Sequence, residues 1–192
     1  MATKSKTKQQ SASTTTPDEF KIESVELKSY KEAGGEETTR FEAKLHLNGS
    51  KKAACVVSNG GTGGCHSYYW VDGYKMEKKF TEYVQKLVKD GVFNDYYESV
   101  KTYYSKNQME PRPIEEYVGV DEYIELLIWE SKVKKACKKK TCFTLKSDEW
   151  GDYREVREAY SEELKQWLTK ECGDDLKEIL NERFIEQPTE VS

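Results

Sequence analysis

The segment best suited to binding chemistry is a glycine-rich stretch in the first half of the chain. Its residues are Asn59, Gly60, Gly61, Thr62, Gly63, Gly64, Cys65 and His66. Glycine tolerates positive φ angles, so such a backbone can point its amide groups inward and hold an anion, phosphate included. The stretch is neither a Walker A loop nor a GxGxxG dinucleotide loop. The alternatives are a long connection, a bulged hairpin, or a site for an anionic ligand or a protein partner.

Cys65 raises the question of a thiol nucleophile. Catalysis by cysteine needs a base within reach of the sulfur and donors for an oxyanion. Adjacent residues on an extended chain point to opposite faces, so His66 is poorly placed to activate Cys65. The other histidine, His46, is predicted on the polar face of a strand, and a Cys65–His46 pair is a conceivable alternative. No complete catalytic set is evident, so enzyme activity stays open and a non-enzymatic role is favoured.

Aromatic residues follow the glycine-rich stretch directly, as Tyr68, Tyr69, Trp70 and Tyr74. They can form a platform on which a base stacks, beside a loop that holds phosphate. They can equally belong to the core, because a tyrosine ring is buried easily while its hydroxyl reaches water. Exposed tyrosine and tryptophan are also enriched in protein interfaces. We favour the core and include Tyr68 and Trp70 in the candidate binding site.

A lysine block near residue 135 is the second candidate site. It contains Lys132, Lys134, Lys135, Lys138, Lys139 and Lys140 and no acidic residue. Six lysines exceed what a helix C-terminus needs, so contact with a polyanion such as nucleic acid is the alternative to a solvated face. The absence of arginine from this block disfavours base-specific recognition.

The sequence predicts neither a metal site nor a cofactor. The chain has five cysteines and two histidines, and among the cysteines only Cys137 and Cys142 lie close together. Structural zinc sites usually use two close ligand pairs. We interpret the cysteines as ordinary reduced thiols.

These candidate residues need a scaffold, and the clearest element is a strand over residues 41–48. Its apolar residues alternate with polar ones for eight positions, which is typical of a strand with one buried face. Asn48-Gly49 favours a tight hairpin turn, because both residues accept positive φ. Residues 53–57 then form the return strand, and residues 20–30 form an irregular first strand. The result is a three-stranded antiparallel meander.

The rest of the chain favours helices. Apolar spacing predicts helices over 76–90 and 92–106, the second with tyrosines as its apolar face, and Pro111 and Pro113 then mark a boundary. Further helices are predicted after Asp121, Ser161 and Asp174, with a hairpin of two short strands at 141–146 and 153–156. The predicted organisation is a flexible basic tail (1–17), a sheet with helices (18–108), and a helical unit with a hairpin (109–192), the last two as separate units or one continuous domain.

Composition places these elements in an α+β protein. The 192 residues carry 35 acidic and 31 basic side chains, for a net charge of −4, and 12% are aromatic. The aromatic content is too high for a disordered chain, and no apolar run approaches the ~18 residues of a membrane span. With no apolar segment typical of a secretory signal, we expect a cytoplasmic protein with no membrane partner.

The stretch FEAKLHLNGSKKAACVVSNGGTGGCHSYYW and the later DDLKEILNER resemble small proteins encoded by phages and other mobile elements. The resemblance implies an accessory role in host takeover or defence, most often by binding, and assigns no role to any residue. We therefore expect a non-enzymatic accessory protein that engages a protein partner or an anionic ligand through the glycine-rich loop and its flanking aromatics. The alternatives are nucleic-acid binding by the lysine block and a cysteine-dependent enzyme using Cys65.

Overall fold

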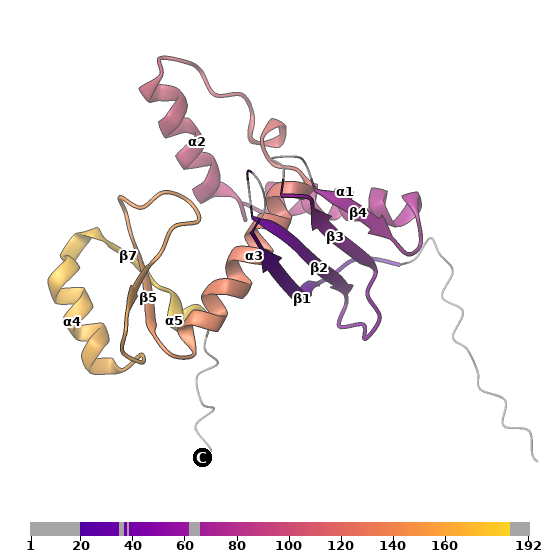
Figure 1. The fold of residues 1–192 in the computed structure, drawn as a ribbon. Coiled ribbons are helices and arrows are strands. Elements are labelled where there is room, and N and C mark those ends of the chain that lie inside the picture. The colour runs from indigo at the N-terminus through magenta and orange to yellow at the C-terminus, as the bar shows by residue number, and fades with distance from the viewer. Residues whose placement is uncertain (1–19, 35–36, 38, 62–65, 185–192) are drawn as a thin grey trace, which may run out of the picture.

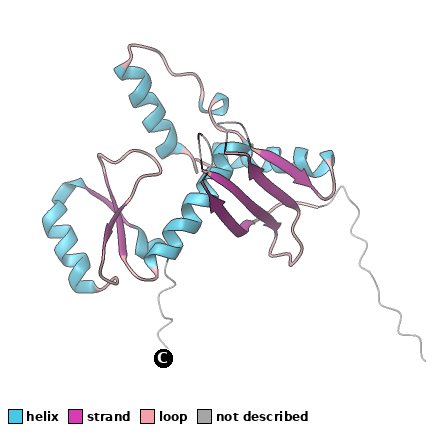
Figure 2. Ribbon diagram, in the orientation of Figure 1, coloured by secondary structure: helices cyan, strands magenta, loops and turns pink. Residues whose placement is uncertain are grey.

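The computed structural model describes residues 20–34, 37, 39–61 and 66–184. These residues form five α-helices and two antiparallel sheets, so the α+β class is confirmed (Figure 2). The predicted tail at 1–17 lies outside the described residues. The strands are β1 Val25–Ala33, β2 Arg40–Leu47, β3 Cys55–Asn59, β4 Ser67–Trp70, β5 Thr141–Leu145, β6 Arg154–Val156 and β7 Leu176–Ile179. The helices are α1 Tyr74–Lys89, α2 Asn94–Lys106, α3 Val120–Cys137, α4 Glu162–Cys172 and α5 Leu180–Phe184, with 3₁₀ turns at Ile114–Glu116 and Gly173–Asp175.

The first sheet has four strands in the order β1-β2-β3-β4, and not three. The predicted hairpin is confirmed, since Asn48 and Gly49 both have positive φ, 52° and 68°. The fourth strand is the aromatic segment, which pairs with β3 through Val56↔Tyr69 and Val57↔Tyr68. A strand of only four residues gives too short an alternation for sequence periodicity to separate it from a loop.

The first strand begins at Val25, later than the predicted residue 20, and its irregularity lies between Lys28 and Lys31. Residues 20–24 precede β1, held there by the side chain of Asn48, whose Oδ1 accepts from the N–H of Glu23 at 2.8 Å. The register with β2 shifts between Lys28 and Lys31, where Ser29 adopts a φ of 55°. This bulge places Tyr30 and Glu32 close to α3.

Helices α1 and α3 cover one face of this sheet and leave the other face open (Figure 1). The main core lies between them, with Leu45 from the sheet, Phe80 from α1 and Ile124 from α3 all fully buried. Gly91 follows the end of α1 with a φ of 83°, the left-handed conformation that glycine commonly adopts after the end of a helix.

The second sheet has three strands in the order β6-β5-β7 and packs with α4 and α5. The prediction of a single last helix from Asp174 was wrong: Leu176–Ile179 is a strand paired with β5, and a short helix follows. Ser161 does cap α4, since its Oγ accepts from the N–H of Leu164 at 3.2 Å. The two strands of the predicted hairpin are β5 and β6, and the third strand of this sheet, β7, was not predicted.

Helix α3 belongs to both parts of the molecule. Its N-terminal half contributes to the main core, and its C-terminal half packs through Val133 and Cys137 against the region of β5 and α5. Figure 1 shows α3 passing beneath the first sheet and out past β1 toward the second sheet. The predicted boundary at residues 108/109 stays a prediction.

Candidate functional site

Strand β4 is one of the two outer strands of the first sheet, and its alternation sorts the aromatic residues. Trp70 is buried, with its ring 5.0 Å from that of Phe80, and Tyr68 is half-buried. Tyr69 lies between them and, because side chains alternate along a strand, faces the opposite side of the sheet, where it is exposed. Two of the predicted binding residues, Tyr68 and Trp70, therefore face the core, and the exposed residue is Tyr69.

His66 and Tyr68 connect the end of the glycine-rich stretch to α3. The Nε2 atom of His66 lies 3.0 Å from Oε1 of Glu125, and its Nδ1 atom lies 3.8 Å from Oδ1 of Asp121. The hydroxyl of Tyr68 donates to the same Asp121 carboxylate. The Phe41 ring packs edge-on against the imidazole, with a 5.0 Å distance between the ring centres.

The electrostatics of this cluster favour a charged histidine. The hydrogen bond to Glu125 and the field of Asp121 raise the pKa of His66, while burial acts in the opposite direction. Burial and the bond to Asp121 raise the pKa of Tyr68 and keep its hydroxyl protonated. Both imidazole nitrogens face carboxylates, so the cluster holds this part of the chain against α3.

Sequence reasoning treated Asp121 as a helix cap and did not find Glu125. The N-cap lies two residues earlier, at Gly119, whose N–H donates to Glu122 at 2.7 Å, and the helix begins at Val120. Asp121 and Glu125 are four residues apart and so share one face of α3. That i, i+4 pair of carboxylates is the sequence signal from which a partner for His66 could have been inferred.

The described start of the glycine-rich stretch is tied to neighbouring chain segments. The Oδ1 atom of Asn59 accepts from the N–H of Phe41 at 3.1 Å, and the carbonyl of Gly61 accepts from the N–H of Glu37 at 3.0 Å. Gly61 has a φ of 73°, whereas Gly60 is exposed. Thr62, Gly63, Gly64 and Cys65 lie outside the described residues, so an anion-binding nest there stays a prediction.

His46 is buried, contrary to the prediction of a polar strand face. Its Nδ1 donates to the carbonyl of Ser50 at 2.9 Å, because the hairpin after β2 folds back toward the imidazole. Along β2, His46 is five residues from Phe41, the residue that pairs with Asn59, which corresponds to about 17 Å. His46 thus lies at the far end of the strand from the start of the glycine-rich stretch.

Three exposed apolar side chains lie at and after β4. Tyr69, Val71 and Tyr74 are 73%, 63% and 79% exposed, and we call them the β4–α1 patch. Val71 also lines a groove of about 730 Å³. The apolar lining of this groove consists of Phe20, Leu47, Ala53, Ala54, Val71 and Met76. Lys52, Lys75 and Lys79 stand around it, with Asp72 as its acidic residue.

The lysine block is divided by the fold. Lys132 pairs with Glu32 at 2.9 Å and lies over the Tyr30 ring, and Lys140 pairs with Glu155. Lys139 is exposed. Lys134, Lys135 and Lys138 line a groove of about 590 Å³ between β1 and α3, which we call the β1–α3 groove. The lysine block is therefore not one continuous positive patch. The charges of Lys132 and Lys140 at its two ends are neutralised by glutamates, and the lysines between them are exposed.

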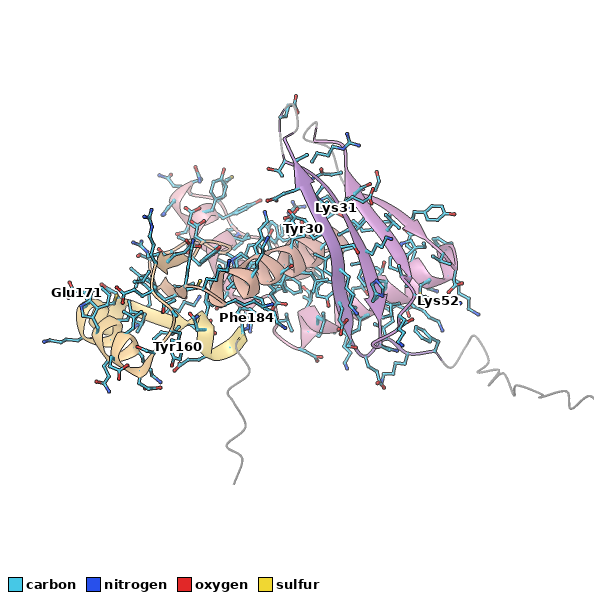
Figure 3. All side chains as sticks on the ribbon, turned by 60° about the horizontal axis from the view of Figure 1, so that its bottom comes forward. Tyr30, Lys31, Lys52, Tyr160, Glu171 and Phe184 are labelled. Atoms are coloured by element: carbon cyan, nitrogen blue, oxygen red, sulfur yellow. The ribbon has the colours of Figure 1, made fainter. Side chains whose placement is uncertain are left out.

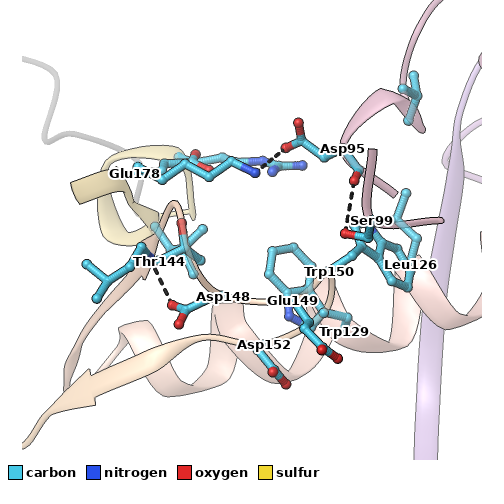
Figure 4. A pocket seen from close by; sticks show the side chains of 16 residues that line it. Asp95, Ser99, Leu126, Trp129, Thr144, Asp148, Glu149, Trp150, Asp152 and Glu178 are labelled. Carbon is cyan, nitrogen blue, oxygen red and sulfur yellow. Dashed lines mark hydrogen bonds and ion pairs between the residues drawn. The ribbon is translucent and has the colours of Figure 1, made fainter. Parts of the chain in front are cut away.

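A smaller cavity of about 120 Å³ lies between α2 and the second sheet (Figure 4). Its charged residues are largely paired within the protein. Lys177 lies 2.9 Å from Asp95, and Asp148 binds both Arg154 at 2.7 Å and the N–H of Leu145 at 2.8 Å. We assign no ligand to it.

Three of the described cysteines, Cys55, Cys137 and Cys142, are buried and therefore poor nucleophiles. Burial raises the pKa of Cys55 and of Cys137 to about 12, and it also raises that of Cys142. Within the described part of the chain, no three histidine, cysteine, aspartate or glutamate residues are grouped to hold a metal ion. A search of the same residues found no helix with the length and apolar content needed to span a membrane.

Comparisons with protein-family models, with curated proteins and with solved structures found no match to this chain.

Proposed function

We propose that this chain is a non-enzymatic binding protein that engages a protein partner through the β4–α1 patch. The observation that supports the proposal is a segment of six residues with three strongly exposed side chains. Tyr69 belongs to the outer strand β4, and Val71 and Tyr74 follow it. Tyrosine is enriched in interfaces because its large rigid ring buries much area at low entropic cost. Two tyrosines and one valine, all strongly exposed within residues 69–74, exceed the single scattered exposures that are normal for a surface.

The groove beside the patch indicates the chemistry of the partner. Its lining is mainly apolar, with Val71 and Met76 among the lining residues. A partner segment with an apolar side chain complements this lining. We infer that such a segment inserts its apolar side chain beside Val71 and Met76.

This proposal refines the expectation from the sequence. The exposed residues of the aromatic run replace Tyr68 and Trp70 as the contact residues. An anionic ligand in the glycine-rich loop is the alternative, and it depends on residues outside the described part. Nucleic-acid binding by the whole lysine block is disfavoured, because Glu32 and Glu155 neutralise its two ends.

The cytoplasmic location and the phage or mobile-element accessory role belong to the same proposal. Four described cysteines are free thiols, which suits a reducing compartment. An accessory role is the implication of the sequence resemblance alone.

The test compares three tagged forms of the full chain purified gently from its own cells. These are the wild type, the double variant Tyr69→Ser/Tyr74→Ser, and the control Tyr103→Ser, which removes an exposed tyrosine from α2. Native mass spectrometry then reports any partner bound in a fixed ratio. The proposal predicts a protein partner with the wild type and the control and at least a tenfold loss with the double variant.

Retention of that partner by the double variant, or its loss from the control as well, overturns the proposal. A bound small anion in place of a protein favours the ligand alternative. Recovery of the chain without any bound partner in all three purifications also contradicts the proposed partner binding.

A further inference from the structure

The second outer strand of the sheet, β1, borders the β1–α3 groove. Val25 and Leu27 from β1, Leu127 from α3 and Phe184 from α5 supply its apolar lining. Lys28, Lys134, Lys135 and Lys138 supply its basic residues. Figure 3 shows α3 extending away from the sheet past β1, with Phe184 lying along the helix. The groove therefore lies at the corner between the first sheet and the second half of α3.

The register of β1 shows which of its backbone groups face this corner. The carbonyl of Ser24 accepts from the N–H of Asn48 at 2.9 Å, and Val25 is paired with Leu47. In an antiparallel ladder, residues whose amide groups face the partner strand alternate with residues whose groups face away. The N–H and C=O groups of Val25 and Leu27 therefore point away from β2. Among the described strands, β2 is the one partner of β1.

The acidic residues of the groove already have cationic partners. Glu26 pairs with Lys28 at 2.6 Å, and Glu130 pairs with Arg183 at 2.7 Å. In contrast, Lys134, Lys135 and Lys138 are exposed and form no ion pair within the described part of the chain. These three lysines thus lie beside an unpaired strand edge without a direct ion pair, although Glu26 and Glu130 act on Lys134 and Glu32 acts on Lys135 from a longer distance.

We propose that the β1–α3 groove binds an extended acidic peptide of a partner protein as an added strand beside β1. The outward amide groups of Val25 and Leu27 pair with the peptide backbone, and its carboxylates meet the three lysines. Alternate residues of a strand are about 6.7 Å apart, and the rise from Lys134 to Lys138 along α3 is about 6 Å. Carboxylates at every second position of the peptide match this spacing.

These observations favour a peptide over single-stranded nucleic acid. A phosphate backbone offers no N–H group to the outward carbonyls of Val25 and Leu27. Stacking of bases needs free aromatic rings. Phe184 is the one aromatic residue of the described groove lining, and its ring already packs against Trp129 at 6.1 Å and Arg183 at 4.9 Å. This inference is independent of the β4–α1 patch, which lies on the opposite edge of the sheet.

The test uses the full chain and a fluorescein-labelled peptide of four Val-Glu repeats in low salt. The groove variant is Lys134→Gln/Lys135→Gln/Lys138→Gln. Its control, Lys51→Gln/Lys89→Gln/Lys106→Gln, removes the same charge from exposed lysines elsewhere. The proposal predicts at least tenfold weaker binding by the groove variant and less than a twofold change in the control. Tyr69→Ser/Tyr74→Ser should bind the peptide as the wild type does.

Amide hydrogen exchange separates strand addition from simple charge attraction. The peptide should slow exchange at Val25 and Leu27 at least tenfold, and a Val-Lys repeat peptide should not. Binding without this protection, equal loss in both lysine variants, or no binding at all overturns the proposal. Tighter binding of an eight-nucleotide thymidine oligonucleotide than of the peptide assigns the groove to nucleic acid and also overturns it.

Discussion

The imidazole of His66 and the carboxylate of Glu125 meet at 3.0 Å across the boundary between the sheet and α3. Glu125 is half-exposed, whereas the His66 side chain is almost fully buried. The contact therefore holds the chain just before β4 against the helix that supports the main core. Its position matters for function because β4 carries Tyr69 and is followed by Val71 and Tyr74.

Glu125→Gln should lower the pKa of His66. The carboxylate is the main cause of the raised value, and an amide stabilises the imidazolium less. An NMR titration of the imidazole Cε1 proton measures the change directly. Glu171→Gln, on α4 at the far end of the molecule (Figure 3), should leave the titration unchanged. An identical His66 titration in Glu125→Gln and the wild type would exclude this ion pair.

The same pair predicts how stability depends on pH. A group whose pKa is higher in the folded state stabilises the fold fully below its unfolded pKa of about 6.5 and loses that effect as the pH rises through the folded value. The wild type should therefore exceed Glu125→Gln in free energy of unfolding by more at pH 6 than at pH 9. The difference should be about 1 kcal/mol or less, because Glu125 is solvated. Urea unfolding at both pH values provides the comparison, and a larger gap at pH 9 contradicts it.

Asn181 is expected to be the most sensitive polar position in the second half of the chain. It is buried, its Oδ1 accepts from the N–H of Cys142 at 2.6 Å, and its Nδ2 donates to the carbonyls of Cys137 and Lys140 at 3.2 and 2.8 Å. Asn181→Ala leaves these groups without partners and should cost about 2–4 kcal/mol. Thermal and urea unfolding measure this cost. Asn107→Ala, at an exposed helix end, should cost about 0.5 kcal/mol or less, and equal effects would refute the assignment.

Cysteine reactivity separates the binding account from the cysteine-enzyme alternative. Cys55 and Cys137, with pKa values raised to about 12 by burial, should react with iodoacetamide far more slowly than the partly exposed Cys172. Peptide mass mapping after timed alkylation gives each rate, and urea should equalise them. If Cys65 reacts much faster than Cys172 near neutral pH, the enzyme alternative gains support.

The sequence predicts the elements whose pattern is local. The alternation through Phe41 and Leu45 and the Asn48-Gly49 turn define β2 and its hairpin, and the structure confirms both. Leu176, Ile179 and Leu180 also fit helical spacing. The sequence alone therefore does not reveal that Leu176–Ile179 forms a strand that pairs with β5. The secondary structure of this segment is determined by its pairing with β5, which is distant in the sequence.

The sequence shows which residue types make up the candidate site, but it does not show how their side chains are oriented or paired. Alternation shows that Tyr69 opposes Tyr68 and Trp70, yet only the packing of Trp70 on Phe80 fixes which side is inside. The lysine block is visible in the sequence, whereas its neutralisation by Glu32 and Glu155 depends on contacts between distant segments.

Site-specific photo-crosslinking tests the central claim most directly. A benzophenone amino acid replaces Tyr69 in one form of the chain and Tyr103 in another, both exposed positions. After irradiation in the chain's own cells, we expect a discrete cross-linked protein from position 69 and none from position 103. The absence of a product from position 69, or the same product from both positions, would contradict a partner-binding role for the β4–α1 patch.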